Sequence, residues 1–150
     1  MKPKKLKANI EYTTPHGHVY RTDHKGRIKE VYADDLSLLD GGRNSYAQRT
    51  VGREDRLPDD DGGHLIARGF GGSKDIDNLV PQSKYINRSF KENGEWYNME
   101  KEWREAIESE DQVKNIKIEV KYSENSQRPN KFDVSCEING EERLYSIENI

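Results

Sequence analysis

Cysteine and long apolar runs are both nearly missing from this chain. Cys136 is the single cysteine, so an intramolecular disulfide framework is excluded. Phe132, Val134 and Ile138 alternate with it, which predicts that Cys136 lies in a half-buried strand. No stretch is apolar enough to span a bilayer or to form the core of a signal peptide. We therefore predict no membrane segment in this chain.

Hydrophobic residues are scarce overall. They make up 31% of the 150 residues, against 35% that are charged. Eight Tyr, three Phe and two Trp nevertheless argue against a disordered chain, because aromatic residues are what a disordered segment lacks. We expect a single domain over residues 1–150, with a modest core and long polar loops.

The chain also has no overall excess of positive charge, since its formal net charge is −3. Nucleic-acid-binding proteins usually present a basic face, but that face can be local. We interpret the lysines within residues 2–7 as a solvated tail. The arginines that bracket a glycine-rich segment near the middle of the chain are Arg43, Arg49, Arg53, Arg56 and Arg68. They predict a positive surface beside that segment.

The glycine-rich segment carries the most specific pattern in the sequence. Residues 61–67 read Asp-Gly-Gly-His-Leu-Ile-Ala, and residues 78–82 read Asn-Leu-Val-Pro-Gln, with Asn87 following. A histidine with a pKa near its ordinary value of about 6.5 can accept a proton from water at neutral pH. Mg²⁺ needs only one or two protein oxygen ligands, because it keeps several waters. The pattern therefore favours metal-assisted hydrolysis of a phosphodiester, with His64 as the base.

The predicted elements before this pattern and within it are mainly strands. Residues 17–33 form a β-hairpin around a polar turn, and residues 45–51 form a possible strand. Residues 64–67 form a short strand, and residues 78–81 form its partner.

A helix and further strands follow. Trp96, Met99, Trp103 and Ile107 recur at helical spacing, which predicts a helix over residues 94–109 with these four side chains in the core. Alternation predicts a strand over residues 116–120, and residues 132–138 and 143–147 form a hairpin across Asn139-Gly140. The fold class is therefore α+β, with a mainly antiparallel sheet.

These motifs resemble a known family. Asp61-x-Gly63-His64, Asn78-x-x-Pro81-Gln82, Asn87 and Trp96-x-x-x-Glu100 together resemble the DNA/RNA non-specific endonucleases, which belong to the ββα-metal or His-Me finger nucleases. Residues 61–67, 70–72 and 78–82, taken together, are similar to the nuclease toxin modules of LXG-type polymorphic toxins. Gram-positive bacteria export these toxins by type VII secretion. The resemblance implies a strand–loop–strand–helix finger embedded in the sheet.

The resemblance also implies roles for the matching positions. His64 takes the position of the general base, and Asn87 that of the direct Mg²⁺ ligand, with Mn²⁺ as an alternative ion. Glu100 matches an acidic position that holds the metal, often through water. Asn78 matches an asparagine that supports the histidine or the phosphate, and Asp61 supports the loop that aims His64. The implied products carry a 5′-phosphate and a 3′-hydroxyl.

Two departures from the family pattern bear on these roles. Gly62 stands where the family typically has an arginine, so the role of that arginine is either lost or supplied from elsewhere, and the candidates are Arg43, Arg49 and Arg68. Residues 88–93 resemble an insertion. On an unbroken helix, Asn87 and Glu100 would lie about 20 Å apart, so a break at residues 93–94 is required if both serve one metal. Two further candidate ligands in this stretch are Glu92 and Asn93.

The resemblance further implies partners and a setting. The implied substrate is DNA, with RNA as an alternative, and a cognate immunity protein is expected to cover or distort the His64 cleft. We expect the domain to be excised from a longer exported toxin that acts in the cytoplasm of a target cell. Two alternative functions are a silent partner-binding module that keeps the fold and a phosphodiesterase acting on small substrates.

Overall fold

The computed structural model describes residues 5–39, 45–89, 91 and 93–150. Six strands form one antiparallel sheet in the order β1-β2-β3-β6-β7-β8, and two strands form a separate antiparallel hairpin. The strands of the large sheet are β1 (Glu11–Thr13), β2 (Val19–Thr22), β3 (Ile28–Asp35), β6 (Val113–Tyr122), β7 (Pro129–Ile138) and β8 (Glu141–Glu148). Mainly antiparallel strands with a few helices confirm the predicted α+β class.

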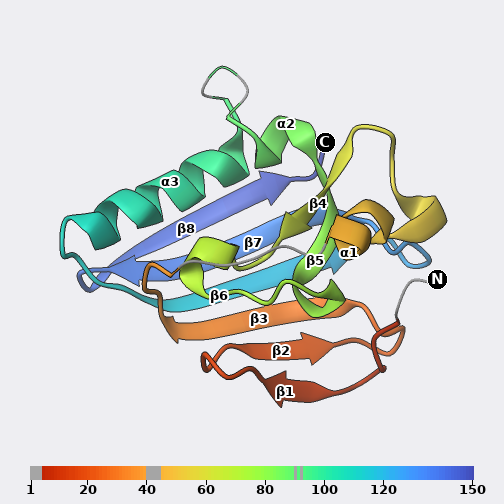
Figure 1. Ribbon diagram of the computed structural model, residues 1–150, viewed down its shortest axis with the longest axis horizontal. Helices are drawn as coiled ribbons and strands as arrows, with labels where there is room; N and C mark the ends of the chain where they lie inside the picture. The colour runs from red at the N-terminus through yellow and green to blue at the C-terminus, as the bar shows by residue number, and fades with distance from the viewer. Residues whose placement is uncertain (1–4, 40–44, 90, 92) are drawn as a thin grey trace.

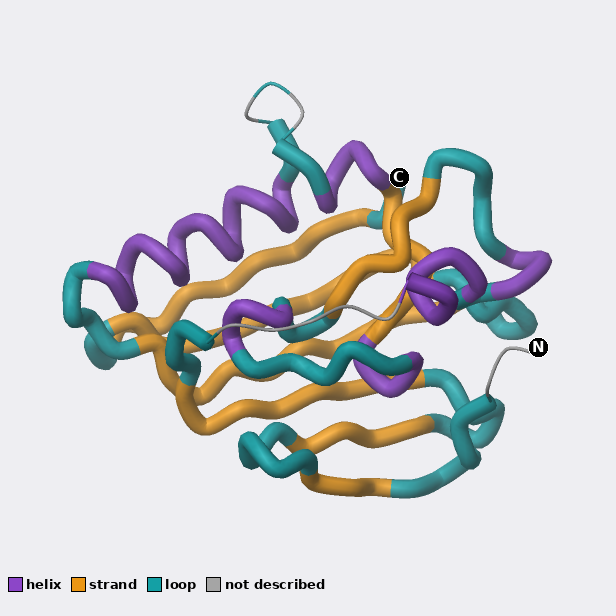
Figure 2. Tube along the Cα trace, viewed as in Figure 1, coloured by secondary structure: helices purple, strands orange, loops and turns teal. Residues whose placement is uncertain are grey.

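The second layer consists of the small hairpin and the helices. Its elements are β4 (Asp60–His64), β5 (Leu79–Ser83), α1 (Ser45–Thr50), α2 (Lys84–Asn87) and α3 (Glu95–Glu108), with 3₁₀ turns η1 (Arg53–Asp55), η2 (Arg68–Phe70) and η3 (Ile76–Asn78). All of these elements lie over one face of the large sheet (Figures 1 and 2). Among the described residues, no helix combines the length and apolar character needed to cross a membrane.

The core lies between α3 and the large sheet. Trp96, Met99 and Trp103 are buried, as their helical spacing predicts, and Ile107 is partly buried. The Trp96 ring packs against Phe132 of β7 at 5.0 Å between ring centroids. The helix begins and ends within one residue of the predicted range of residues 94–109. Periodicity predicts this element well because one continuous stripe is buried.

The predicted hairpins are also confirmed. Strands β2 and β3 pair within residues 17–33, and β7 and β8 pair across Asn139-Gly140. Asn139 has φ 51° and Gly140 has φ 82°, so both central residues adopt the left-handed conformation that this two-residue turn requires. Cys136 lies on β7, which is buried at alternate residues as predicted, and the Cys136 side chain is on the buried face.

Two predicted elements are wrong. Residues 45–51 were expected to form a strand, but residues 45–50 form α1. The strand expected at residues 64–67 ends at His64 and begins earlier, at Asp60. A strand rich in aspartate and glycine shows no apolar alternation, so its pattern resembles a loop. Its glycines are required by packing: a Cβ on Gly62 would lie 2.2 Å from the Gln48 carbonyl oxygen.

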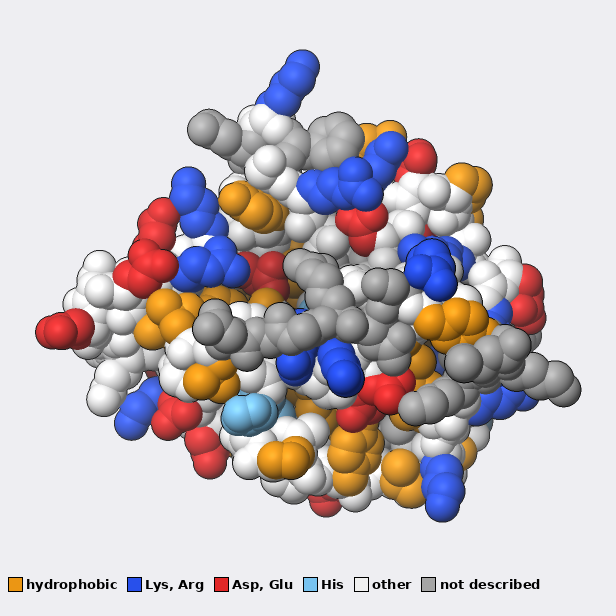
Figure 3. Space-filling view, viewed as in Figure 1, with side chains coloured by type: hydrophobic (Ala, Val, Ile, Leu, Met, Phe, Trp, Pro, Cys, Tyr) orange, Lys and Arg blue, Asp and Glu red, His pale blue; other side chains and the backbone are white. Residues whose placement is uncertain are grey.

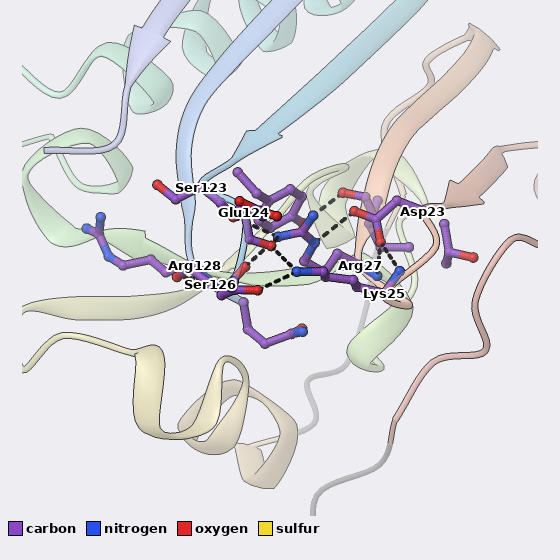
Figure 4. A network of polar contacts seen from close by, with 12 residues as sticks. Asp23, Lys25, Arg27, Ser123, Glu124, Ser126 and Arg128 are labelled. Carbon is purple, nitrogen blue, oxygen red and sulfur yellow. Dashed lines mark hydrogen bonds and ion pairs between the residues drawn. The ribbon is translucent and has the colours of Figure 1, made fainter.

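Arg27 joins the two turns at one end of the large sheet. Its Nε donates to Asp23 Oδ2 at 2.8 Å, and its Nη1 donates to the carbonyl oxygens of Ser123 and Ser126 at 2.8 and 2.9 Å. Figure 4 shows these contacts between the β2–β3 turn and the β6–β7 turn. Because Arg27 is buried and its side chain hydrogen-bonds to both turns, it has a structural role.

The small hairpin is tied to the large sheet near the C-terminus. Asn149 accepts from the Ser83 N–H at 2.7 Å and donates from Nδ2 to the Pro129 carbonyl at 2.7 Å. Arg128 binds Asp60 of β4 with both carboxylate oxygens engaged, at 2.7 and 2.9 Å. These contacts fix both strands of the hairpin that carries the candidate site.

Candidate active site

His64 is the last residue of β4, and it lies opposite Leu79 of β5. Its side chain is half-buried at the point where the strand becomes an irregular segment. The next residue, Leu65, donates its backbone N–H to the Asn78 carbonyl oxygen at 2.9 Å, which extends the hairpin by one hydrogen bond. The hairpin thus presents a histidine at the end where its connecting segment begins, next to a backbone that is held by hydrogen bonds.

Asn78 holds the segment that follows His64. Its Oδ1 accepts from the Ile66 N–H at 2.9 Å and from the Tyr20 hydroxyl at 2.8 Å. Its Nδ2 donates to the carbonyl oxygens of Ile66 at 2.7 Å and Ser73 at 2.9 Å. Asn78 is fully buried, so the structure places its amide within the protein and not against solvent. This geometry suits support of the histidine segment.

Asp61 and Asn87 lie together, although they come from different elements. Asn87 ends α2, and its Nδ2 donates to Asp61 Oδ2 at 3.0 Å. A carboxylate can only accept, so this contact sets the amide orientation and leaves Oδ1 as the atom that can bind a cation. An amide oxygen is a hard ligand of the kind Mg²⁺ prefers. Asn87 therefore fits a Mg²⁺ ligand in both type and orientation.

Arg88 completes this cluster, and the sequence analysis did not assign it a role. Its Nε and Nη2 bind Asp61 Oδ2 and Oδ1 at 3.0 and 2.7 Å. Partial burial would raise the pKa of Asp61, but the hydrogen bonds from Arg88 and Asn87 outweigh it and lower that pKa below its ordinary value. Asp61 is therefore a carboxylate at neutral pH. The only feature of the sequence that could have indicated a role for Arg88 is its position directly after Asn87.

The helix break between Asn87 and Glu100 is present. Strand-like backbone at Arg88 ends α2, and Gly94 precedes α3, which packs against α2. Burial raises the pKa of Glu100 to about 7, while Arg104 and the Trp96 indole act in the opposite direction. A carboxyl that is costly to ionise alone is the kind that a cation would stabilise. Of the two alternative ligands, Asn93 is exposed and Glu92 lies outside the described residues.

A shallow cleft of about 460 Å³ opens beside the Asp61–Asn87 pair. The residues that line it are Gln48, Arg49, Arg56, Asp61, Gly62, Asn87 and Arg88. Figure 3 shows Lys and Arg side chains gathered over α1 and α2, on either side of an acidic patch. Within the described part of the chain, His64, Asn78 and Glu100 do not line this cleft.

The arginines predicted to bind the substrate do not all lie at the cleft. Arg49 lines the cleft from the last turn of α1 and is exposed. Arg68 lies on η2, donates to the Gly72 carbonyl, and is absent from the cleft lining. Arg43 lies outside the described residues. Arg56 lines the cleft as well, but it bonds to the backbone carbonyls of Gln48 and Asp60.

The packing of α1 explains why Gly62 replaces the arginine that is typical of the family. Gln48 Nε2 donates to the Gly62 carbonyl at 3.3 Å, and the Gln48 backbone fills the space where a Cβ at position 62 would be. A side chain there would push α1 away from β4. The same helix brings Arg49 to the cleft, so positive charge is supplied from another element.

No three side chains among the described His, Cys, Asp and Glu residues are arranged to hold a metal ion. A centre at this cleft would therefore depend on the Asn87 amide oxygen and on water, as Mg²⁺ sites commonly do. A hairpin whose first strand ends in His64, followed by a short helix that ends in Asn87, has the strand–loop–strand–helix order that the sequence predicts.

The chain belongs to the DNA/RNA non-specific endonuclease family, whose model matches residues 8–140. It is similar to the type VII secretion system protein EssD of Staphylococcus aureus strains USA300 and NCTC 8325, with 75% identity over 149 residues in each case. That match covers 99% of this chain but 24% of EssD, so the chain spans about a quarter of the length of these relatives.

Solved structures share the fold at low sequence identity. NucA from Streptococcus agalactiae with no metal bound matches with a TM-score of 0.69 and 18% identity, over 98% of this chain and 76% of that one. The magnesium-bound NucA structure matches with a TM-score of 0.65, 18% identity and coverage of 99% and 77%. Sda1 nuclease with a bound zinc ion matches with a TM-score of 0.69, 14% identity and coverage of 96% and 85%.

Proposed function

We propose that this nuclease hydrolyses phosphodiester bonds of DNA, and of RNA as a second substrate, in a Mg²⁺-dependent and sequence-tolerant manner. The observation that carries the proposal is the hydrogen bond from Asn87 to Asp61, which orients the Asn87 amide. Both residues line a cleft that also contains arginines, and Asp61 lies on β4, the strand that ends at His64. Arginine recognises backbone phosphates independently of base sequence, which suits a sequence-tolerant enzyme.

In the proposed reaction, His64 takes a proton from a water molecule. The hydroxide formed attacks phosphorus as the bond to the 3′ oxygen breaks. That oxygen takes a proton from a water molecule and the protonated His64 returns its proton to solvent, which leaves a 3′-hydroxyl and a 5′-phosphate. Arg49 binds the substrate backbone, and Asn78 keeps the His64 segment in place. Asp61 and Arg88 hold the Asn87 amide in its ligand orientation.

Asn87 would hold the metal directly, and Glu100 is the candidate for a second contact through water. The chemistry that a bound divalent ion supplies here is neutralisation of charge on the phosphate and on the leaving oxygen. An amide oxygen suits Mn²⁺ as well as Mg²⁺, so Mn²⁺ is the alternative ion. NucA with magnesium and Sda1 with zinc are fold relatives that bind divalent ions.

The test is cleavage of plasmid DNA by the purified domain. We expect Mg²⁺ to support cleavage, EDTA to abolish it, and His64→Ala to lower kcat by about 10²- to 10⁴-fold. His24→Ala is the matched control, because His24 is an exposed histidine in the β2–β3 turn. Intact plasmid with the parent protein would favour a silent binding module, and cleavage restricted to a small phosphodiester would favour the small-substrate alternative.

We also propose that the domain is exported as part of a longer toxin and is inhibited by an immunity protein. EssD is a type VII secretion system protein, which supports export of this domain as part of a longer toxin. A producing cell would then need an immunity protein, and acidic groups on it would complement Arg49 and Arg88 at the cleft. Loss of plasmid cleavage when such a partner co-purifies with the domain would support this, and cleavage unchanged by every co-expressed partner would oppose it.

A further inference from the structure

Tyr20 lies on β2 of the large sheet, far in sequence from the motif that contains His64. It is fully buried, and its hydroxyl donates to Asn78 Oδ1 at 2.8 Å across a separation of 58 residues. This hydrogen bond connects the large sheet directly to the hairpin that presents the histidine. We propose that Tyr20 is a positioning residue for the nuclease reaction, acting through Asn78 on the segment that follows His64.

The first support is the number of constraints that meet at Asn78. Its side chain bonds both the N–H and the carbonyl of Ile66, and its backbone carbonyl accepts from Leu65. Both residues directly after His64 are therefore fixed by one asparagine. Because Asn78 Nδ2 already donates to two carbonyls, its Oδ1 is the acceptor that faces Tyr20.

The second support is that Tyr20 itself is held firmly. The Tyr12 ring stacks on it with centroids 5.5 Å apart and an angle of 11° between the planes. Burial raises the pKa of Tyr20 well above its usual value of 10, so the hydroxyl keeps its proton and remains a donor at any working pH. The anchor therefore does not depend on pH.

The third support is the tight packing around the contact. A Cβ on Gly72 would lie 1.8 Å from the Ile66 carbonyl oxygen and 2.7 Å from Asn78 Nδ2. Glycine at this position lets the backbone close directly over the asparagine. Small displacements of a catalytic group lower the rate strongly, so a rigid connection from the sheet to this segment has a catalytic consequence.

The proposal rests on the proposed nuclease reaction, and Tyr20→Phe tests it by removing one hydroxyl. Tyr122→Phe is the matched control, because the Tyr122 hydroxyl donates to the Ile28 carbonyl at 2.7 Å with no connection to the His64 segment. Each variant loses one hydrogen bond donated by a tyrosine of the large sheet. Steady-state cleavage of a double-stranded oligonucleotide at saturating Mg²⁺ and hydrogen exchange of the Ile66 amide are measured for each, well below the unfolding temperature.

For Tyr20→Phe we expect kcat to fall about tenfold, with KM and the Mg²⁺ activation constant within about twofold of the parent. The Ile66 amide should exchange about tenfold faster, since its acceptor is less restrained. Tyr122→Phe should leave kcat and Ile66 exchange within about twofold of the parent values. Parent-like kcat in Tyr20→Phe, or an equal fall in both variants, would overturn the proposal. If the parent does not cleave at all, the proposed function fails, and Ile66 exchange alone decides whether Tyr20 positions this segment.

Discussion

Asp61 and Asn87 are 26 residues apart in the chain, yet the Asn87 amide donates to the Asp61 carboxylate at 3.0 Å. The bond joins the start of the small hairpin to the end of α2. It also orients an uncharged side chain for a cation, because the carboxylate accepts the amide N–H and leaves the amide oxygen as the atom that can bind a cation. Arg88 donates two further hydrogen bonds to the same carboxylate.

Asp61→Ala should therefore weaken metal binding without removing a ligand. Loss of a group that orients a ligand typically costs about 10- to 100-fold in metal affinity or activity. We expect the Mg²⁺ activation constant for plasmid cleavage to rise by this factor, with partial rescue at high Mg²⁺. Asp59→Ala is the control, since Asp59 is an exposed neighbour that pairs with Lys84. Equal effects of the two variants would mean that only local charge matters.

Gly62→Ala should destabilise the domain by about 1–3 kcal/mol, because the added Cβ overlaps the Gln48 backbone. Displacement of α1 should also move Arg49 and reduce cleavage. Urea unfolding measures the first effect. Gly69→Ala is the control, since its Cβ would meet only an ordinary contact, 3.9 Å from the Leu39 carbonyl oxygen. A fully stable Gly62→Ala variant would contradict the described packing of α1 on β4.

Arg49→Ala should weaken binding of nucleic acid of any sequence. Arg49 is exposed in the cleft, so it is available to a phosphate. We expect KM to rise and the slope of log affinity against log salt concentration to fall in magnitude by about 1. Lys29→Ala removes the same charge from an exposed position on β3 and should change neither quantity. An unchanged salt slope in Arg49→Ala would remove Arg49 from the substrate surface.

Glu100→Gln should change how stability depends on pH when metal is absent. Burial raises the pKa of Glu100 from 4.5 to about 7, so between these values the folded state holds a proton that the unfolded state has released. The free energy of unfolding of the parent therefore falls as pH rises through this window, and glutamine removes that contribution. Urea unfolding in EDTA at pH 5 and pH 8 should show Glu100→Gln gaining stability relative to the parent at the higher pH.

The matched control for this comparison is Glu108→Gln, an exposed glutamate on the same helix. It should follow the parent at both pH values. Parallel pH dependence of the parent and Glu100→Gln would mean that the surroundings of Glu100 do not raise its pKa.

Some elements of this protein follow from short sequence patterns because local physics decides them. The α3 stripe of Trp96, Met99 and Trp103 has helical spacing whatever the rest of the chain does. Asn139-Gly140 favours a two-residue turn through its own backbone preferences. The family motifs also identify the chain as a nuclease, because each motif consists of a few residues that are close together in the sequence.

Other elements could not be predicted from local pattern. The strand Asp60–His64 has no apolar alternation, because two of its residues are glycines that allow Gln48 and Gln82 to approach closely. The helix α1 also lacks a periodic apolar face, and its position depends on the contact between Gln48 and Gly62.

The sequence by itself determined the residue types of the candidate site, the family and the long amphipathic helix, because each depends on spacing within a short stretch. Only the tertiary structure decided which of those residues meet. It brought Asn87 to Asp61, added Arg88, placed Arg49 at the cleft and Arg68 elsewhere, and linked Tyr20 to Asn78. Such contacts join residues that are tens of positions apart, and packing of the whole chain sets the distances between them.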